Sequence, residues 1–94
     1  MGGPGPQVVS CAEIAGEAVV NTAGEPLGRL EQLLVDVPSG RIERAVFARG
    51  GVFGIGARFF SVPWSDLAHD PKARCFILDV SKQALDSFLS SYDL

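Results

Sequence analysis

The sequence predicts a mainly β protein: a small β-barrel of five or six antiparallel strands, with short helical turns and a C-terminal helix. Three observations support this fold class. Short segments rich in valine, leucine and phenylalanine are separated by turn signals of Gly, Pro, Asn and Asp. One long segment changes the parity of its apolar residues part-way, which indicates a bend. The 94 residues, 47% of them hydrophobic, are enough for one core.

The first elements follow a polar lead. Residues 1–9 begin with MGGPGPQ and are expected to be flexible, and residues 10–94 to form a single domain. Ser10 and Glu13 fit a capping box, which predicts a short helical turn that ends at Gly16.

A valine-rich strand is expected in EAVVNT, which spans residues 17–22. The overlapping NTAGE, residues 21–25, carries the residues of a turn.

The longest predicted strand, PLGRLEQLLVDV, contains a fault in its alternation. Leu33 shares its parity with Val35 and Val37, whereas Leu30 has the other parity. Period-2 alternation would put these two sets on opposite faces of the sheet unless an extra residue shifts the register. We therefore expect a β-bulge near Glu31–Gln32, which would bend the strand sharply.

The next two strands flank a glycine-rich loop. VPSG, residues 37–40, has the pattern of a type I turn, and the strand after it is expected over Arg41–Arg49. In that strand Ile42, Val46 and Ala48 share one face, with Arg44 the exception. After the loop, alternation puts three residues on one face of the following strand, and Pro63 ends that strand. These three residues are Phe60, Val62 and Trp64.

The C-terminal part predicts a turn, a strand and a helix. SDLAHDP, residues 65–71, is typical of a single helical turn with Ser65 as N-cap and Pro71 as the stop. CFILDV, residues 75–80, is the last predicted strand. Ser81 then caps a helix expected over 81–92. Its apolar stripe consists of Leu85, Phe88, Leu89 and Tyr92.

Composition excludes several classes of function. The net charge is −3 and the eight basic residues are scattered, so we expect no nucleic-acid partner. No apolar run approaches the ~18 residues of a membrane span, so no membrane insertion is expected. The N-terminus lacks the pattern of a signal peptide, so we expect a cytoplasmic protein. Cys11 and Cys75 are accordingly expected to be free, buried thiols.

The glycine-rich loop raises the question of phosphate binding. Gly50, Gly51, Gly54 and Gly56 lie within seven residues, but a strand and not a helix is expected to follow them. Both the dinucleotide fingerprint and the P-loop need a helix at that point, and the P-loop also needs a Lys-Ser/Thr pair. The loop is therefore interpreted as a hairpin connection, and no cofactor is expected.

Several of these pieces, in this order, resemble the PRC-barrel domain family. They are G-x-x-V-V-N from Gly16 with G-x-x-L-G from Gly24, D-x-x-x-G-R-I from Asp36, the glycine-rich loop, and F-x-V-P-W from Phe60. The resemblance covers Ser10 to about Ser81. It implies a small β-barrel used as an interaction module, as in the reaction-centre H subunit and a ribosome maturation factor. The transmembrane helix of the former and the second barrel of the latter are not seen here, so the stand-alone, bacterial type matches best.

Chemistry-bearing residues are few. Asp66, His69 and Asp70 would share one side of the predicted helical turn, which raises divalent-metal binding or, with Ser65, a catalytic triad. A solvated turn explains them as well, and a triad needs residues from separate segments beside an oxyanion hole. We therefore expect no metal, no catalytic residue and no enzymatic activity.

The functional prediction is protein–protein interaction through apolar residues outside the core. Strand alternation assigns Phe60, Val62, Trp64, Phe76, Leu78 and Val80 to the barrel interior. The outward residues and the loop tip remain, and either the C-terminal helix or a second subunit covers them. We expect a homodimer, or contact with another protein, through Phe47, Val52, Phe53, Ile55, Phe59 and Ile77. The alternative is a small-ligand site in a barrel mouth lined by Phe53, Phe59 and Trp64.

Overall fold

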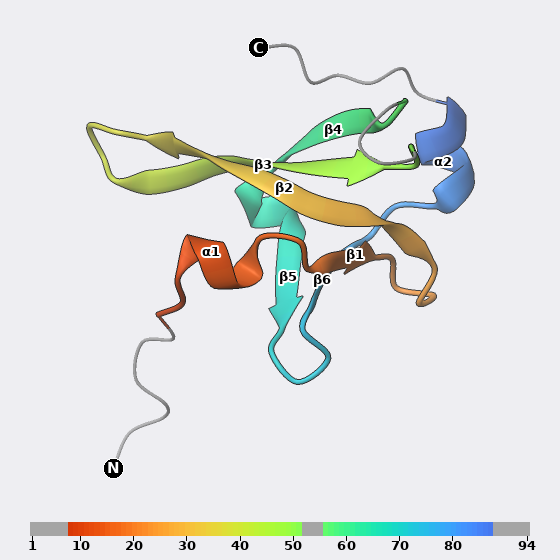
Figure 1. Cartoon of the computed structure of the whole chain (residues 1–94), viewed down its shortest axis with the longest axis horizontal. Coiled ribbons are helices and arrows are strands. Elements are labelled where there is room, and N and C mark those ends of the chain that lie inside the picture. Colours follow the sequence, from red (N-terminus) through yellow and green to blue (C-terminus); the bar gives the residue numbers. More distant parts are fainter. Residues whose placement is uncertain (1–7, 52–55, 88–94) are drawn as a thin grey trace.

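The protein is built mainly from β-strands that form one curved sheet (Figure 1). The structure is a computed structural model that describes residues 8–51 and 56–87. In chain order the elements are α1 (Cys11–Ile14), β1 (Ala18–Val20), β2 (Pro26–Asp36), β3 (Arg41–Arg49), β4 (Arg58–Pro63), the 3₁₀ turn η1 (Trp64–Asp66), β5 (Leu67–Asp70), β6 (Cys75–Leu78) and α2 (Lys82–Ser87).

The mainly β fold class is confirmed, and the six strands form a mixed half-barrel in the order β4-β3-β2-β1-β6-β5. Two details of the prediction are wrong. No hairpin joins β1 to β6, so their connection does not require an antiparallel pair, and they pair in parallel, whereas the other pairs are antiparallel. The described strands also leave β4 and β5 as the edges of the sheet, joined through η1, so the barrel is not closed.

The predicted bulge in β2 is confirmed. Leu30 pairs with Phe47 and Gln32 pairs with Val46, so Glu31 is the extra residue. Because of this insertion, Leu30 and Leu33 both face the core although their parity differs.

A second bulge, in β3, overturns the predicted position of Phe47. Leu34 pairs with Arg44 and Val35 pairs with Ile42, so Glu43 is inserted. The insertion reverses the alternation after Ile42, and the side chain of Phe47 points inward instead of outward. Phe47 is fully buried and its ring stacks on Phe60, its cross-strand partner, with 5.4 Å between the ring centroids.

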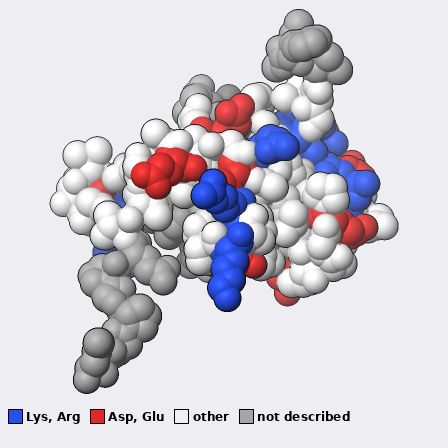
Figure 2. Space-filling model, turned by 60° about the horizontal axis from the view of Figure 1, so that its bottom comes forward, with Lys and Arg blue, Asp and Glu red and all other residues white. Residues whose placement is uncertain are grey.

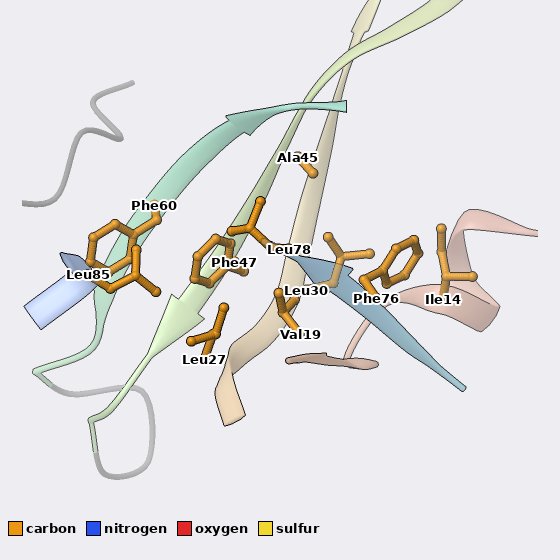
Figure 3. Packing of buried hydrophobic residues seen from close by; sticks show 10 residues of the cluster. All are labelled: Ile14, Val19, Leu27, Leu30, Ala45, Phe47, Phe60, Phe76, Leu78 and Leu85. Atoms are coloured by element: carbon orange, nitrogen blue, oxygen red, sulfur yellow. The ribbon is translucent and has the colours of Figure 1, made fainter. Parts of the chain in front are cut away.

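The core lies inside the curve of the sheet (Figure 3). Phe60, Phe76 and Leu78 are buried as predicted, while Val62, Trp64 and Val80 pack against them partly buried. Figure 3 shows Leu85 of α2 beside Phe60 at one end of the core, and Ile14 of α1 beside Phe76 at the other. The two helices therefore close the two ends of the half-barrel.

The segment predicted as a helical turn is a short 3₁₀ turn followed by a strand. Pro63, not Ser65, is the N-cap of η1, and β5 pairs with β6 in an antiparallel hairpin. The carboxylate of Asp70 accepts hydrogen bonds from the backbone N–H groups of Lys72 and Ala73, at 3.0 and 3.1 Å. Asp70 thus closes the hairpin turn, and strand pairing overrides the local helical pattern of this segment.

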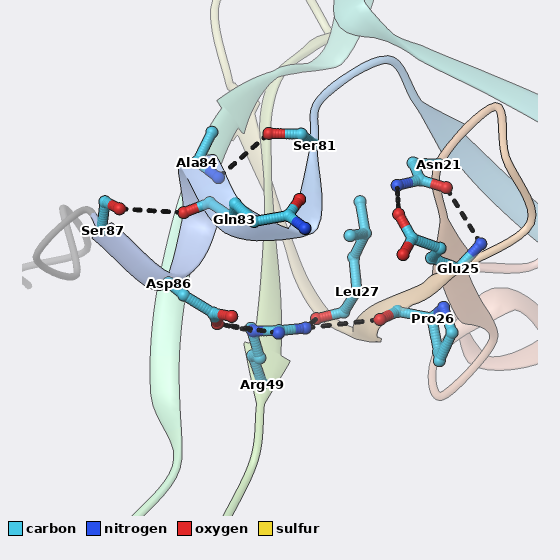
Figure 4. Close-up of polar contacts among 10 residues, drawn as sticks. All are labelled: Asn21, Glu25, Pro26, Leu27, Arg49, Ser81, Gln83, Ala84, Asp86 and Ser87. Atoms are coloured by element: carbon cyan, nitrogen blue, oxygen red, sulfur yellow. Dashed lines mark hydrogen bonds and ion pairs between the residues drawn. The ribbon is translucent and has the colours of Figure 1, made fainter.

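Both predicted N-cap serines cap their helices, but among the described residues the Glu13 side chain does not complete the capping box with Ser10. The Ser10 hydroxyl accepts the N–H of Ala12 at 3.1 Å at the start of α1, and the Ser81 hydroxyl accepts the N–H of Ala84 at 3.0 Å in α2 (Figure 4). The predicted helix extends to residue 92, but residues 88–92 lie outside the described part. The lead predicted over 1–9 is described only at Val8 and Val9.

Arg49 connects the helix α2 to the sheet (Figure 4). Its guanidinium donates to the carboxylate of Asp86 at 2.8 and 3.1 Å, and to the carbonyl oxygens of Pro26 and Leu27 at 3.3 and 3.0 Å. The Arg49 side chain is only 16% exposed. This arrangement holds α2 over the end of the half-barrel at which Leu85 is buried.

The turn between β1 and β2 is organised by one buried polar side chain. The Asn21 side-chain oxygen accepts the backbone N–H groups of Ala23 and Glu25, at 3.0 and 2.9 Å. Its amide nitrogen donates to the Glu25 carboxylate at 2.8 Å. The predicted NTAGE turn is thus present, and it depends on the side chain of Asn21.

Candidate interaction surface and groove

The residues predicted to form an interaction surface are not one exposed patch. Phe47 is in the core, and Phe59 and Ile77 are half-buried. Val52, Phe53 and Ile55 lie outside the described residues, and their predicted role stays a prediction. Leu85 of α2 packs in the inner core, on the opposite face of β4 from Phe59. In the described part of the chain, α2 therefore does not cover the outer face.

The exposed large apolar side chains of the described residues lie elsewhere. They are Val8, Val9, Val35 and Val37. Val8 and Val9 precede α1, Val35 lies near the end of β2, and Val37 directly follows β2. Val35 borders a shallow hollow of about 310 Å³ together with Cys11, Ala12 and Ala15. Val37, at the β2–β3 turn, is 83% exposed. We name Cys11, Ala12, Ala15, Val35 and Val37 the hairpin patch.

The hairpin patch has a polar border. Glu31 and Gln32, at the bulge in β2, line the same hollow and are exposed. An apolar surface with a polar rim is the usual composition of a protein interface. Sequence alternation missed this patch, but one signal was available: Val37 directly precedes Pro38-Ser39-Gly40, and the residues of a tight turn lie at the surface.

A second groove lies next to α1 and shares Cys11 and Leu33 with the hollow of the hairpin patch. Its volume is about 390 Å³. Trp64 and Phe76 contribute aromatic rings whose centroids are 5.8 Å apart. The remaining lining residues are Val8, Val9, Cys11, Ile14, Leu33, Ile42, His69 and Pro71.

This groove corrects the predicted ligand-binding mouth. Trp64 lines the groove as expected, but Phe59 does not. Phe59 lies in β4 at an odd-numbered position and Trp64 directly follows β4 at an even-numbered one, and alternate positions of a strand face opposite sides of the sheet. Phe53 lies outside the described residues.

The groove continues into a more polar hollow. The two share Val9, Ile14, His69 and Pro71, and the second, of about 460 Å³, adds Glu13, Glu17 and Arg74 among its lining residues. His69 Nε2 lies 2.9 Å from a carboxylate oxygen of Glu17, and the His69 ring packs on Phe76 with 4.6 Å between centroids. His69 therefore ties β5 to the segment between α1 and β1.

The residues considered for metal binding or catalysis do not form a site. His69 and Asp70 are consecutive residues of a strand, so their side chains point to opposite faces of the sheet. The Asp70 carboxylate is occupied by the turn that it closes. Within residues 8–51 and 56–87, no three His, Cys, Asp or Glu side chains gather as metal ligands would.

The surface charges of the protein are mixed in sign. Figure 2 shows acidic and basic side chains interspersed on the face in view, with large uncharged areas between them.

Cys75 is half-buried and Cys11 is exposed, so the prediction that both are buried is wrong for Cys11, but neither forms a disulfide. Of the helices in the described ranges, none has the length and apolar character needed to cross a bilayer.

Comparison with known proteins identifies the family of the chain. A family model described as the PRC-barrel domain matches residues 6–85, which include every described strand. No curated protein matches the chain.

Proposed function

Since the chain belongs to the PRC-barrel domain family, we propose that it is a non-enzymatic protein-interaction module and that one of its partners is a second copy of itself. The observation that carries this proposal is the hairpin patch, in which the exposed Val35 lies beside the small side chains of the α1 region and the exposed Val37 follows two residues later in the chain. Small soluble proteins rarely leave adjoining apolar groups in contact with water without using them.

The shape of the hairpin patch supports a protein partner. Its hollow of about 310 Å³ is bordered by the alanines and Cys11 of the α1 region, whose short side chains let another surface approach closely. The side chain of an apolar residue from a partner would fill this hollow. Burial of apolar area contributes about 25 cal/mol per Å², and Glu31 and Gln32 at the rim would supply polar contacts.

The proposal places the module in the cytoplasm of a bacterium, with no cofactor. Two observations support this. Cys11 is exposed and unpaired, as is usual in a reducing compartment. The residues considered for metal binding are used by the fold, in the turn closed by Asp70 and in the contact between His69 and Glu17.

Light scattering at rising protein concentration tests self-association. We expect the wild-type mass to rise toward twice the chain mass of 9.9 kDa at high micromolar concentration. The substitution Val35→Asp puts a charge into the apolar contact and should keep the protein monomeric. The matched control is Thr22→Asp, which adds the same charge at the exposed β1–β2 turn and should dimerise normally. A wild-type protein that stays monomeric, or a Val35→Asp variant that dimerises like the wild type, would contradict the proposal.

Cysteine labelling gives an independent readout of the same surface. Cys11 lies in the hairpin patch and Cys75 lies in β6 outside it. We expect alkylation of Cys11 to slow as the wild-type concentration rises, because the second copy covers the thiol, and to stay fast in Val35→Asp. Alkylation of Cys75 should not change with concentration. Equal concentration dependence at both thiols would point to a different contact.

A further inference from the structure

The groove beside Trp64 combines an apolar half with a charged half. The apolar half is formed by the rings of Trp64 and Phe76 with three aliphatic side chains around them, those of Ile14, Leu33 and Ile42. An aromatic or large aliphatic group fits such a space, because aromatic rings prefer tilted or offset packing against other rings. The volume of this apolar half, about 390 Å³, is in the range of small-molecule sites.

The charged half contains two opposite charges that the fold does not use. Glu13 and Arg74 both line the adjoining hollow. Within the described ranges, no hydrogen bond or ion pair is formed by either of these two side-chain groups. The other ionisable side chains there, Glu17 and His69, are engaged with each other.

Arg74 also occupies an unusual backbone position. Its φ of 54° is the only positive value among the described non-glycine residues. Glycine or asparagine is the favoured residue in this region of φ, so an arginine here is backbone-disfavoured. Unfavourable backbone conformations persist where the surrounding structure holds them, and they concentrate at functional sites.

We propose that this groove binds a free apolar α-amino acid, with phenylalanine as the best-fitting example. The side chain of the amino acid lies in the apolar half against Trp64 and Phe76. The Arg74 guanidinium donates hydrogen bonds to the α-carboxylate, and the Glu13 carboxylate accepts them from the α-ammonium. This activity goes beyond the proposed protein interaction. The groove borders the hairpin patch at Cys11, but Trp64, Glu13 and Arg74 line only the groove and its adjoining hollow, and Val35 lines only the hollow of the patch.

Fluorescence of Trp64 tests the proposal directly, because Trp64 is the only tryptophan of the chain. Titration with L-phenylalanine, excited where phenylalanine does not absorb, should change the emission and saturate. Three analogues each lack one of the recognised groups: 3-phenylpropanoate lacks the ammonium, L-phenylalaninamide lacks the carboxylate, and glycine lacks the side chain. Each should bind about tenfold more weakly or not at all, since each loses one interaction of the set.

Arg74→Gly separates ligand binding from folding. Glycine relieves the positive φ, so the melting temperature of this variant should not fall, whereas L-phenylalanine binding should be lost. Glu13→Gln should weaken L-phenylalanine while leaving 3-phenylpropanoate unchanged. Lys72→Gln, which removes a charge from the same turn outside the groove, is the matched control and should bind normally.

Three results would overturn the proposal. One is the absence of a saturable change with L-phenylalanine. Another is undiminished binding by Arg74→Gly. The last is equal binding of L-phenylalanine and of an N-acetylated, C-amidated phenylalanine peptide, which would assign the groove to peptide side chains instead. Val35→Asp should bind L-phenylalanine like the wild type, so the ligand site and the dimer contact can fail independently.

Discussion

Phe47 is the residue that joins the inner faces of β3 and β4. Its side chain is fully buried and stacks on Phe60. Phe47→Ala would leave a cavity, and we expect it to lower the free energy of unfolding by about 3–5 kcal/mol. Urea denaturation measures this loss. Phe59→Ala, at a half-buried aromatic in the same pair of strands, should lose clearly less. Similar losses for the two variants would contradict the inward position of Phe47.

Gly28 permits β2 to approach β3 closely. A Cβ at this position would collide with the backbone carbonyl of Ala48 and lie 3.0 Å from the Phe47 ring. We expect Gly28→Ala to lower the free energy of unfolding by about 1–3 kcal/mol. Amide hydrogen exchange should accelerate at Arg29 and Ala48, which are paired across these strands.

The control for this substitution is Gly24→Ala. Its added Cβ meets nothing within 4 Å, and its cost comes only from a φ of +81°. Exchange at Arg29 and Ala48 should therefore stay slow in this variant. Faster exchange at these amides in Gly24→Ala but not in Gly28→Ala would refute the steric role of Gly28.

At the scale of elements, α2 is held by both apolar and polar contacts. Leu85 is buried in the core, and Arg49 bonds Asp86 and two carbonyl oxygens of β2. We expect Arg49→Gln to lower the free energy of unfolding by about 1–3 kcal/mol, because it leaves these acceptors without their charged donor. Asp86→Asn should cost less, since the Asp86 side chain is 54% exposed.

Hydrogen exchange locates the effect of Arg49→Gln. Amides of α2 should exchange faster than in the wild type, whereas those of β6 should change only as much as the global stability does. If the amides of α2 and β6 accelerate by the same factor, Arg49 acts on the whole fold and not on the docking of α2.

The elements differ in how well the sequence predicts them. The bulge at Glu31 was predictable because Leu30 and Leu33 are large, apolar and of opposite parity. The bulge at Glu43 was not predicted. Arg44 interrupts the alternation of Ile42, Val46 and Ala48, but a single charged residue on an apolar face does not by itself indicate an inserted residue. That insertion reversed the orientation of Phe47, and with it the predicted outer face.

Strand β5 shows a second limit of local patterns. With Asp66 before it, the segment Leu67–Asp70 carries polar groups at the i, i+3, i+4 spacing of one helical turn, Asp66, His69 and Asp70. This segment forms a strand and not a helical turn because it pairs with β6, a different segment of the chain, and because Asp70 closes the turn between the two strands. Periodicity within so few residues cannot distinguish these outcomes.

At the scale of the whole molecule, the family and the single curved sheet follow from the order of short motifs, and the family match over residues 6–85 agrees with it. The parallel pairing of β1 with β6 and the open edges depend on how the chain closes in space, so no short segment encodes them. No short segment encodes the hairpin patch either, because α1 and the end of β2 are distant in sequence and meet only at the hollow that they share.

Self-association through the hairpin patch is tested most directly by backbone amide chemical shifts measured at low and at high protein concentration. We expect the concentration-dependent shifts to occur at the residues of the hairpin patch, which are Cys11, Ala12, Ala15, Val35 and Val37. In Val35→Asp these shifts should be absent. Shifts gathered around Phe59 and Ile77 with none at the hairpin patch, or no concentration dependence at all, would contradict this self-association.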